Sequence, residues 1–178
     1  LVASGELQRW IDEHGVSGVT SNPAIFAQAF ATDPAYAEPL AALRATEPDR
    51  ERRFERLALA DVQSACDQLR PTWDRSGGDA GYVSFEVSPS LSRDGVGTLV
   101  AARRLWAQIQ RPNAMIKIPA TRECMDAITQ AMAEGININV TLIFSRAQAQ
   151  QVFDACAAGL AQRVAQGLPV ARVRAVAS

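Results

Sequence analysis

The sequence predicts an α/β fold built on a parallel sheet. Short apolar segments alternate with long amphipathic ones along the chain, which is the pattern of strands joined by crossover helices. No internal repeat, low-complexity stretch or linker interrupts this alternation, so we expect one domain over residues 1–178. The chain starts without Met inside a helical pattern and stops in an apolar run, and we expect that domain to be incomplete at both ends. An open doubly wound sheet and a closed barrel both fit this order of elements.

Strands are expected where apolar runs lie between turn-forming residues, and helices where apolar residues recur every three to four positions. Capping residues mark several helix ends, among them the Ser145 and Gln148 capping box, Gly135 and Gly167. The expected strands cover residues 16–20, 82–87, 114–118, 136–144 and 173–177. The expected helices cover residues 2–13, 34–44 (weakened by Pro39), 48–69, 92–109, 121–134 and 145–166.

The composition is that of an ordinary globular protein, with 48% hydrophobic residues, 21% charged residues and a formal net charge of -1. This balance removes the electrostatic case for nucleic acid or an anionic membrane as partner. No apolar run reaches the roughly 18 residues of a membrane-spanning helix, and no signal-peptide pattern is present, so we expect a cytoplasmic protein. Cys66, Cys124 and Cys156 lack metal-ligand spacing, and we expect them to be reduced core residues.

One lysine stands out among the 18 Lys and Arg residues, because the other 17 are Arg. This residue, Lys117, lies inside the apolar run of residues 115–119. The difference is chemical, since a buried Lys can lose its proton whereas Arg stays charged. Burial of an amine favours its neutral form, and a neutral amine can add to a ketone and form a Schiff base. Lys117 is therefore the candidate nucleophile.

Polar residues lie near the carboxyl ends of all five expected strands, where a buried strand ordinarily carries Val or Ile. Side chains alternate faces along a strand, so the polar residues of each strand share a face, as Ser84, Glu86 and Ser88 do. In a parallel barrel those strand ends surround one mouth, where catalytic residues lie. The polar residues are Thr20, Asn22, Glu86, Lys117, Asn139, Thr141 and Ser178.

A Schiff base needs a positioned water and a proton carrier, which Glu86 and the Thr141 hydroxyl can supply. Asn22 and Asn139 offer both donors and acceptors for substrate hydroxyls. Structural readings stand beside these: Lys117 and Glu86 as a buried ion pair, Asn22 as a turn residue before a proline, and the threonines as capping or strand residues. His14 is interpreted as a helix C-terminal residue.

Four motifs in this order resemble the transaldolases, and the resemblance covers residues 15–178. It is closest to the bacterial branch with a longer insertion after the TSNP motif. The motifs are GVTSNP at 18–23, VSFEV at 83–87, IKIPAT at 116–121 and NVTLIFS at 139–145.

The resemblance implies a (β/α)8 TIM barrel of which these residues hold about the second through sixth strands. It implies transfer of a dihydroxyacetone unit from a ketose phosphate (sedoheptulose 7-phosphate or fructose 6-phosphate) to an aldose phosphate, in the non-oxidative pentose phosphate pathway. No metal or organic cofactor is implied. The alternatives are a Schiff-base aldolase of the same fold acting on another sugar phosphate, and a non-catalytic barrel that serves as a binding module. Assembly into a homo-oligomer is left open.

By motif, Lys117 resembles the Schiff-base lysine, and Glu86 resembles the carboxylate that handles the catalytic water with Thr141. The remaining candidates match substrate-binding positions, with Ser178 near the substrate phosphate. The family's acid/base Asp is expected before residue 1 and its phosphate-binding Arg after residue 178. Ser88 stands where the family has an acidic residue two positions after Glu86. The substrate-binding candidates are Thr20, Asn22, Asn139 and Ser178.

Overall fold

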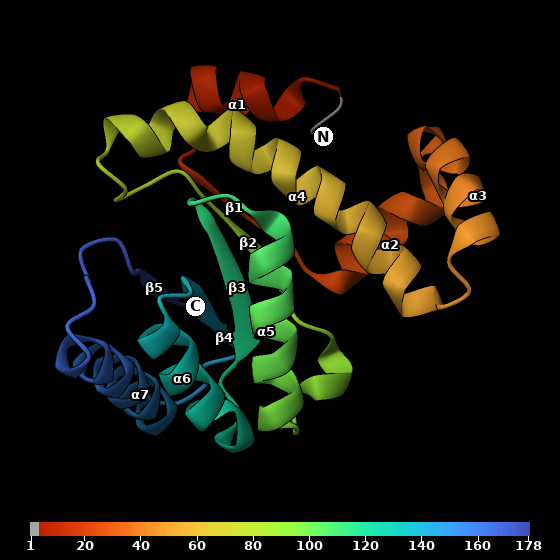
Figure 1. Ribbon diagram of the computed structural model, residues 1–178. Helices are drawn as coiled ribbons and strands as arrows, with labels where there is room; N and C mark the ends of the chain where they lie inside the picture. The colour runs from red at the N-terminus through yellow and green to blue at the C-terminus, as the bar shows by residue number, and fades with distance from the viewer. Residues whose placement is uncertain (1–3) are drawn as a thin grey trace. The chain divides into compact units, whose positions relative to one another are not determined.

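The computed structural model describes residues 4–178, and its five strands form one sheet in the order β1-β2-β3-β4-β5 (Figure 1). Each strand is thus added beside its predecessor, whereas a doubly wound sheet reverses direction at a switch point. The order therefore favours the barrel type of winding over the open alternative. The strands are β1 Gly18–Thr20, β2 Tyr82–Glu86, β3 Ala114–Pro119, β4 Ile138–Thr141 and β5 Ala175–Ala177. The chain divides into two compact units, Leu1–Val83 and Ser84–Ser178, which are described separately.

The first unit is mostly helical, and its longest helix, α4, contacts the other α-helices. Both α1 and α3 pack against α4, and Figure 1 shows α1 lying along it. An aromatic cluster joins α2 to α4, with the ring centroids of Phe30 and Phe54 5.4 Å apart. The Tyr36 hydroxyl donates to Asp61 Oδ2 of α4 at 2.5 Å. The helices are α1 Glu6–His14, α2 Pro23–Thr32, η1 Pro34–Tyr36, α3 Ala37–Thr46 and α4 Arg50–Arg75.

The helices of this unit differ from expectation in three ways: α2 is additional, α4 is longer, and the helix expected over 34–44 is divided. Helix α2 is not among the expected helices, because eight of its ten residues are apolar and the helical period is weak. Helix α4 was expected to end at residue 69 but continues through Pro71 to Arg75. The helix expected from residue 34 divides into η1 and α3, and Pro39 falls in the first turn of α3, where a missing N–H costs little. The expected start of the first helix at residue 2 lies outside the described residues.

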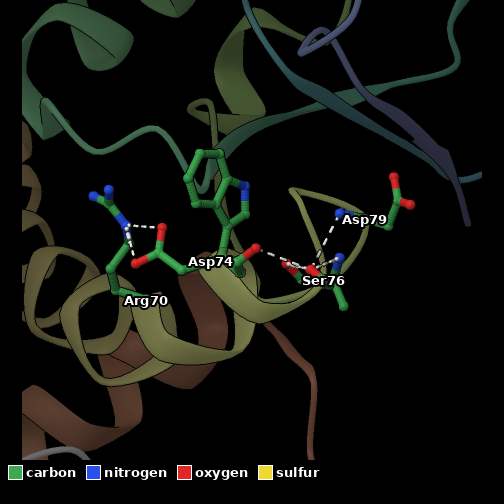
Figure 2. Close-up of polar contacts among 6 residues, drawn as sticks. Arg70, Asp74, Ser76 and Asp79 are labelled. Carbon is green, nitrogen blue, oxygen red and sulfur yellow. Dashed lines mark hydrogen bonds and ion pairs between the residues drawn. The ribbon is translucent and has the colours of Figure 1, made fainter.

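The end of α4 is fixed by side-chain hydrogen bonds, which Figure 2 shows. Arg70 Nε donates to both carboxylate oxygens of Asp74, at 3.0 and 3.1 Å. The Ser76 hydroxyl donates to Trp73 O and accepts from the backbone N–H groups of Asp79 and Ala80. This one hydroxyl therefore ties the loop before β2 to the last turn of α4.

The second unit places helices α5, α6 and α7 side by side over its strands (Figure 1). The pairs β3–β4 and β4–β5 are parallel, and a right-handed crossover puts α6 and α7 on the same face of the sheet. Ile116, Ile118, Ile138 and Val140 are fully buried, and alternation places them on the face opposite Lys117. The helices are η2 Pro89–Leu91, α5 Gly95–Ile109, η3 Arg122–Cys124, α6 Met125–Glu134 and α7 Arg146–Ala165.

Local chemistry explains where the predicted bounds of this unit fail. The Asp94 carboxylate caps α5 through the Gly97 N–H, so α5 begins three residues after the expected Ser92. Helix α6 begins at Met125 rather than at Thr121, because η3 precedes it and the Thr121 hydroxyl donates to Ser92 O. Strand β4 ends at Thr141, since Leu142 has a left-handed φ of 63° that no strand continues. The Ser145 cap of α7 is confirmed.

A surface groove of about 630 Å³ lies within the first unit, formed by α2, η1, α3 and α4. Its walls include Phe30, Leu40 and Phe54, and it contains none of the candidate site residues. Among residues 4–178, no helix combines the length and apolar character needed to cross a membrane.

Candidate functional site

Lys117 and Glu86 lie in contact, as an ion pair between neighbouring strands. Lys117 is the one residue of β3 that is not fully buried. Its Nζ lies 3.3 Å from Glu86 Oε2, and the two side chains are only 12% and 16% exposed. The Val87 N–H donates to Lys117 O at 3.1 Å, which sets the two strands beside each other at this level. An amine and a carboxylate held so close and largely shielded from water can exchange a proton directly.

Asn139 lies beside Lys117, since the two are register partners in the parallel β3–β4 pair. Asn139 is 6% exposed, and both ends of its side-chain amide are bonded. Its Nδ2 donates to Ser84 Oγ at 3.0 Å, and its Oδ1 accepts from Ser178 Oγ at 3.0 Å. The amide is therefore held at both ends, between β2 and the residue after β5.

Thr141 comes two residues after Asn139 and so lies on the same face of β4. It is 8% exposed, and within residues 4–178 its hydroxyl has no hydrogen-bond partner. A hydroxyl of this kind can hold a water or a substrate oxygen. The structure thus brings Glu86, Lys117, Asn139, Thr141 and Ser178 together within the second unit.

Thr20 and Asn22 belong to the first unit, where Thr20 ends β1. Asn22 is the N-cap of α2, and its Oδ1 accepts from the Ile25 N–H at 2.9 Å. The turn reading of Asn22 is thus close to the observed role. Within the described residues the Asn22 amide nitrogen has no hydrogen-bond partner, so the group retains a donor.

Ser84 is the site residue that was not singled out. Its hydroxyl contacts Asn139, although β3 separates the strands that carry the two residues. The available signal was its position, two residues before Glu86 and therefore on the same face. Ser88, which replaces the expected acidic residue, instead bonds through its hydroxyl to the Ser90 hydroxyl at 2.8 Å. In the described part of the chain, no group of three His, Cys, Asp or Glu side chains could hold a metal ion.

The fold and this geometry define a class, the parallel α/β proteins wound in one direction with a lysine beside a carboxylate on adjacent strands. The chain belongs to the transaldolase/fructose-6-phosphate aldolase family, whose profile matches residues 3–178. The five parallel-wound strands are accordingly part of that family's TIM barrel.

Curated relatives named transaldolase match the chain throughout. The protein of Thiobacillus denitrificans is 53% identical over 178 residues, that of Neisseria gonorrhoeae 49% over 178, and both alignments cover the whole chain. The protein of Thermobifida fusca is 45% identical over 175 residues, or 98% of this chain. The chain spans about half the length of these relatives, with 50%, 50% and 48% of each covered.

Proposed function

We propose that the full-length protein is a transaldolase that uses Lys117 as its Schiff-base residue. It transfers a dihydroxyacetone unit from a ketose phosphate, sedoheptulose 7-phosphate or fructose 6-phosphate, to an aldose phosphate in the non-oxidative pentose phosphate pathway. The observation that carries this proposal is the contact between Lys117 Nζ and Glu86 Oε2 at 3.3 Å. Family membership and relatives named transaldolase support it.

In the proposed reaction, the neutral Lys117 amine adds to the carbonyl carbon of the ketose. The carbonyl oxygen takes up one proton from the attacking amine and a second from the protonated Glu86 and leaves as water, so that an iminium cation forms. The hydroxyl on the β carbon then loses its proton to a base, and the bond between the α and β carbons breaks. The electron pair of that bond neutralises the iminium cation to give an enamine, and the aldose phosphate leaves as an aldehyde. The three-carbon unit remains on Lys117 until it adds to the acceptor aldehyde and water hydrolyses the imine.

Glu86 is proposed as the proton carrier for these steps. It contacts Lys117 and is mostly buried, so it can take the proton that the amine must lose before it attacks. We propose that the Thr141 hydroxyl holds the water that leaves on dehydration and attacks on hydrolysis. The absence of an intramolecular partner for this hydroxyl among residues 4–178 supports that role.

The substrate-binding roles are proposed for residues that present amide or hydroxyl groups. Asn139 lies beside Lys117 and is joined to Ser178 by a hydrogen bond, which suits recognition of donor hydroxyls, and Ser178 is assigned to the phosphate end of the substrate. Thr20 and Asn22 are assigned to the same substrate on the basis of their motif. We propose that residues 1–178 belong to a single barrel domain.

The second candidate is a Schiff-base aldolase, because the family also includes fructose-6-phosphate aldolases. Assays with paired ketose and aldose phosphates separate the two. A transaldolase forms product only when an acceptor aldose phosphate is present, whereas an aldolase releases the free three-carbon ketone from the ketose phosphate without one. A folded full-length protein that is inactive in both assays would support a non-catalytic binding module and contradict the proposal.

We further propose that the protein acts in the cytoplasm, without metal or organic cofactor, on sugar phosphates and not on nucleic acid or membranes. The near-neutral charge and the family's chemistry support this. Full activity after dialysis against a metal chelator is the expected result, and size-exclusion chromatography with light scattering measures whether the protein is a homo-oligomer.

A further inference from the structure

The hydrogen bond between Asn139 and Ser84 joins two strands that are not neighbours. Asn139 lies on β4 and Ser84 on β2, with β3 between them. Adjacent strands lie roughly 4.8 Å apart, so in a flat sheet β2 and β4 are about 9.6 Å apart and parallel side chains cannot meet. The bond nevertheless measures 3.0 Å between Nδ2 and Oγ. The sheet must therefore curl over β3 at this point.

The bridge lies at the base of the Lys117 side chain. Ser84 is one inward-facing position before Glu86, whose carboxylate contacts Lys117 Nζ. Asn139 is the register partner of Lys117 on the other side. Ser84 and Asn139 are 4% and 6% exposed, so water does not compete for their bond. The bond therefore links β2 to β4 across the strand that carries Lys117, on the same face of the sheet as the Lys117 side chain.

The Asn139 side chain is bonded to Ser178 as well as to Ser84. With Nδ2 bonded to Ser84, Oδ1 turns toward Ser178 and accepts its hydroxyl proton at 3.0 Å. The Val140 carbonyl is a more distant alternative acceptor for that proton, at 3.4 Å. The Ser178 hydroxyl is thus engaged by the protein as well. Because both partners of the amide are hydroxyls, which can donate or accept, the bridge fixes the position of the Asn139 side chain and not which of its ends faces Ser178.

We propose that Ser84 is a positioning residue that holds the Asn139 side chain in place beside Lys117, for recognition of the three-carbon donor. This proposal rests on the proposed function, because it assigns Asn139 and Ser178 to the donor. Ser84 itself need not touch the substrate. Its effect is therefore expected in donor recognition, with the acceptor aldose phosphate recognised as before.

The test is Ser84→Ala in the full-length protein, with Ser64→Ala on an exposed position of α4 as the matched control. We expect Ser84→Ala to raise the donor KM about tenfold, the effect of one lost hydrogen bond, with the acceptor KM and the folded state unchanged. In an Asn139→Ala background, Ser84→Ala should have no further effect, because the residue through which it acts is gone. An equal effect of Ser84→Ala in both backgrounds, or no effect in a folded variant, overturns the proposal.

A measurement independent of activity keeps the test separate from the proposed function. Solvent exchange of the Asn139 side-chain amide, followed by ¹⁵N NMR, should be slow in the wild type and faster in Ser84→Ala. Unchanged exchange contradicts the positioning role whatever the enzyme does. Failure of the wild type to form a borohydride-trapped adduct with ketose phosphates contradicts the proposed function while leaving the amide measurement intact.

Discussion

Lys117 Nζ and Glu86 Oε2 are 3.3 Å apart, on neighbouring strands, with both side chains more than four-fifths buried. The pair has two readings, a structural ion pair and an amine held beside its proton carrier. A structural pair contributes only to stability, and a buried pair broken on one side leaves an uncompensated charge. A catalytic pair affects imine formation as well. The two readings therefore separate when stability and chemistry are measured on the same variant.

Glu86→Gln is expected to slow Schiff-base formation by roughly 10²–10⁴-fold, the usual loss when a general acid or base is removed. Donor binding should be mostly kept, because the amide retains the size of the carboxylate. Rapid-quench measurement of the adduct, with donor affinity taken from equilibrium binding, checks this. Glu38→Gln on exposed α3 is the control. Normal imine formation in a folded Glu86→Gln protein would leave the pair with a structural role.

Substitutions of Asn22 separate its two functions, which are capping of α2 and donation of a hydrogen bond by its side-chain amide. Asp is as good an N-cap as Asn, so Asn22→Asp should keep the bond to Ile25 and the stability of α2. It removes the amide donor, however, and should weaken donor binding. Asn22→Ala should lose both functions, with a cost of about 1 kcal/mol in the free energy of unfolding. Urea denaturation and donor KM are the measurements, and wild-type donor KM in Asn22→Asp would restrict this residue to capping.

Arg103 and Glu134 link α5 to α6 in a pH-dependent way. Arg103 Nε donates to Glu134 Oε2 at 2.7 Å, and this hydrogen bond holds the pKa of Glu134 below its usual range. A carboxyl whose pKa is lowered on folding stabilises the fold above its unfolded pKa, and that contribution disappears as pH falls through the folded value. Arg103→Gln should therefore be less stable than the wild type near pH 7, with the difference vanishing at acidic pH, below the lowered pKa of Glu134.

Chemical denaturation of both proteins across this range tests the sign. Arg56→Gln, an exposed position of α4, serves as the control and should show no such trend. A difference that persists at low pH would mean that Arg103 acts through packing of its side chain and not through Glu134.

Gly159 permits the close approach of α7 to α6. A Cβ at this position would lie 2.3 Å from Thr129 O and 2.6 Å from Met132 Cβ, so either helix must shift to accept it. Gly159→Ala is expected to destabilise the protein by roughly 1–3 kcal/mol, the usual cost of overpacking, although Ala favours helix more than Gly does. Thermal and urea unfolding measure this. The exposed neighbour Ala158→Ser should have little effect, and a stabilised Gly159→Ala protein would show that the helices are not in tight contact.

The sequence predicts this fold well where burial and flanking turns agree, as in β2 and β3, whose bounds differ from expectation by one residue. It fails where a single backbone conformation decides, as at Leu142, which ends β4 three residues early. Helix α2 is not predicted, because nearly all of its residues are apolar and they show little helical period. Asn22 and Pro23 nevertheless mark its start as capping residues.

The candidate site could be predicted only in part, because side-chain alternation along a strand predicts some of its contacts and not others. The Lys117–Glu86 contact joins adjacent strands, and period-two alternation alone brings their side chains to one face. The Ser84–Asn139 bond joins alternate strands and depends on the curvature of the sheet, which no pattern of residue types along the chain encodes. Long-range partners of this kind emerge only in three dimensions.

The most direct test of the central claim is borohydride trapping of the full-length protein with a ketose phosphate donor, followed by peptide mapping. Lys117 is the single lysine in these 178 residues, so a side-chain adduct within them must map to the peptide that contains residues 116–118. We expect one three-carbon adduct at Lys117 and none in Lys117→Arg, because the guanidinium keeps its proton and cannot add to a carbonyl. Normal transfer of the three-carbon unit by a folded Lys117→Arg protein, or an adduct only outside this peptide, would contradict the Schiff-base role of Lys117.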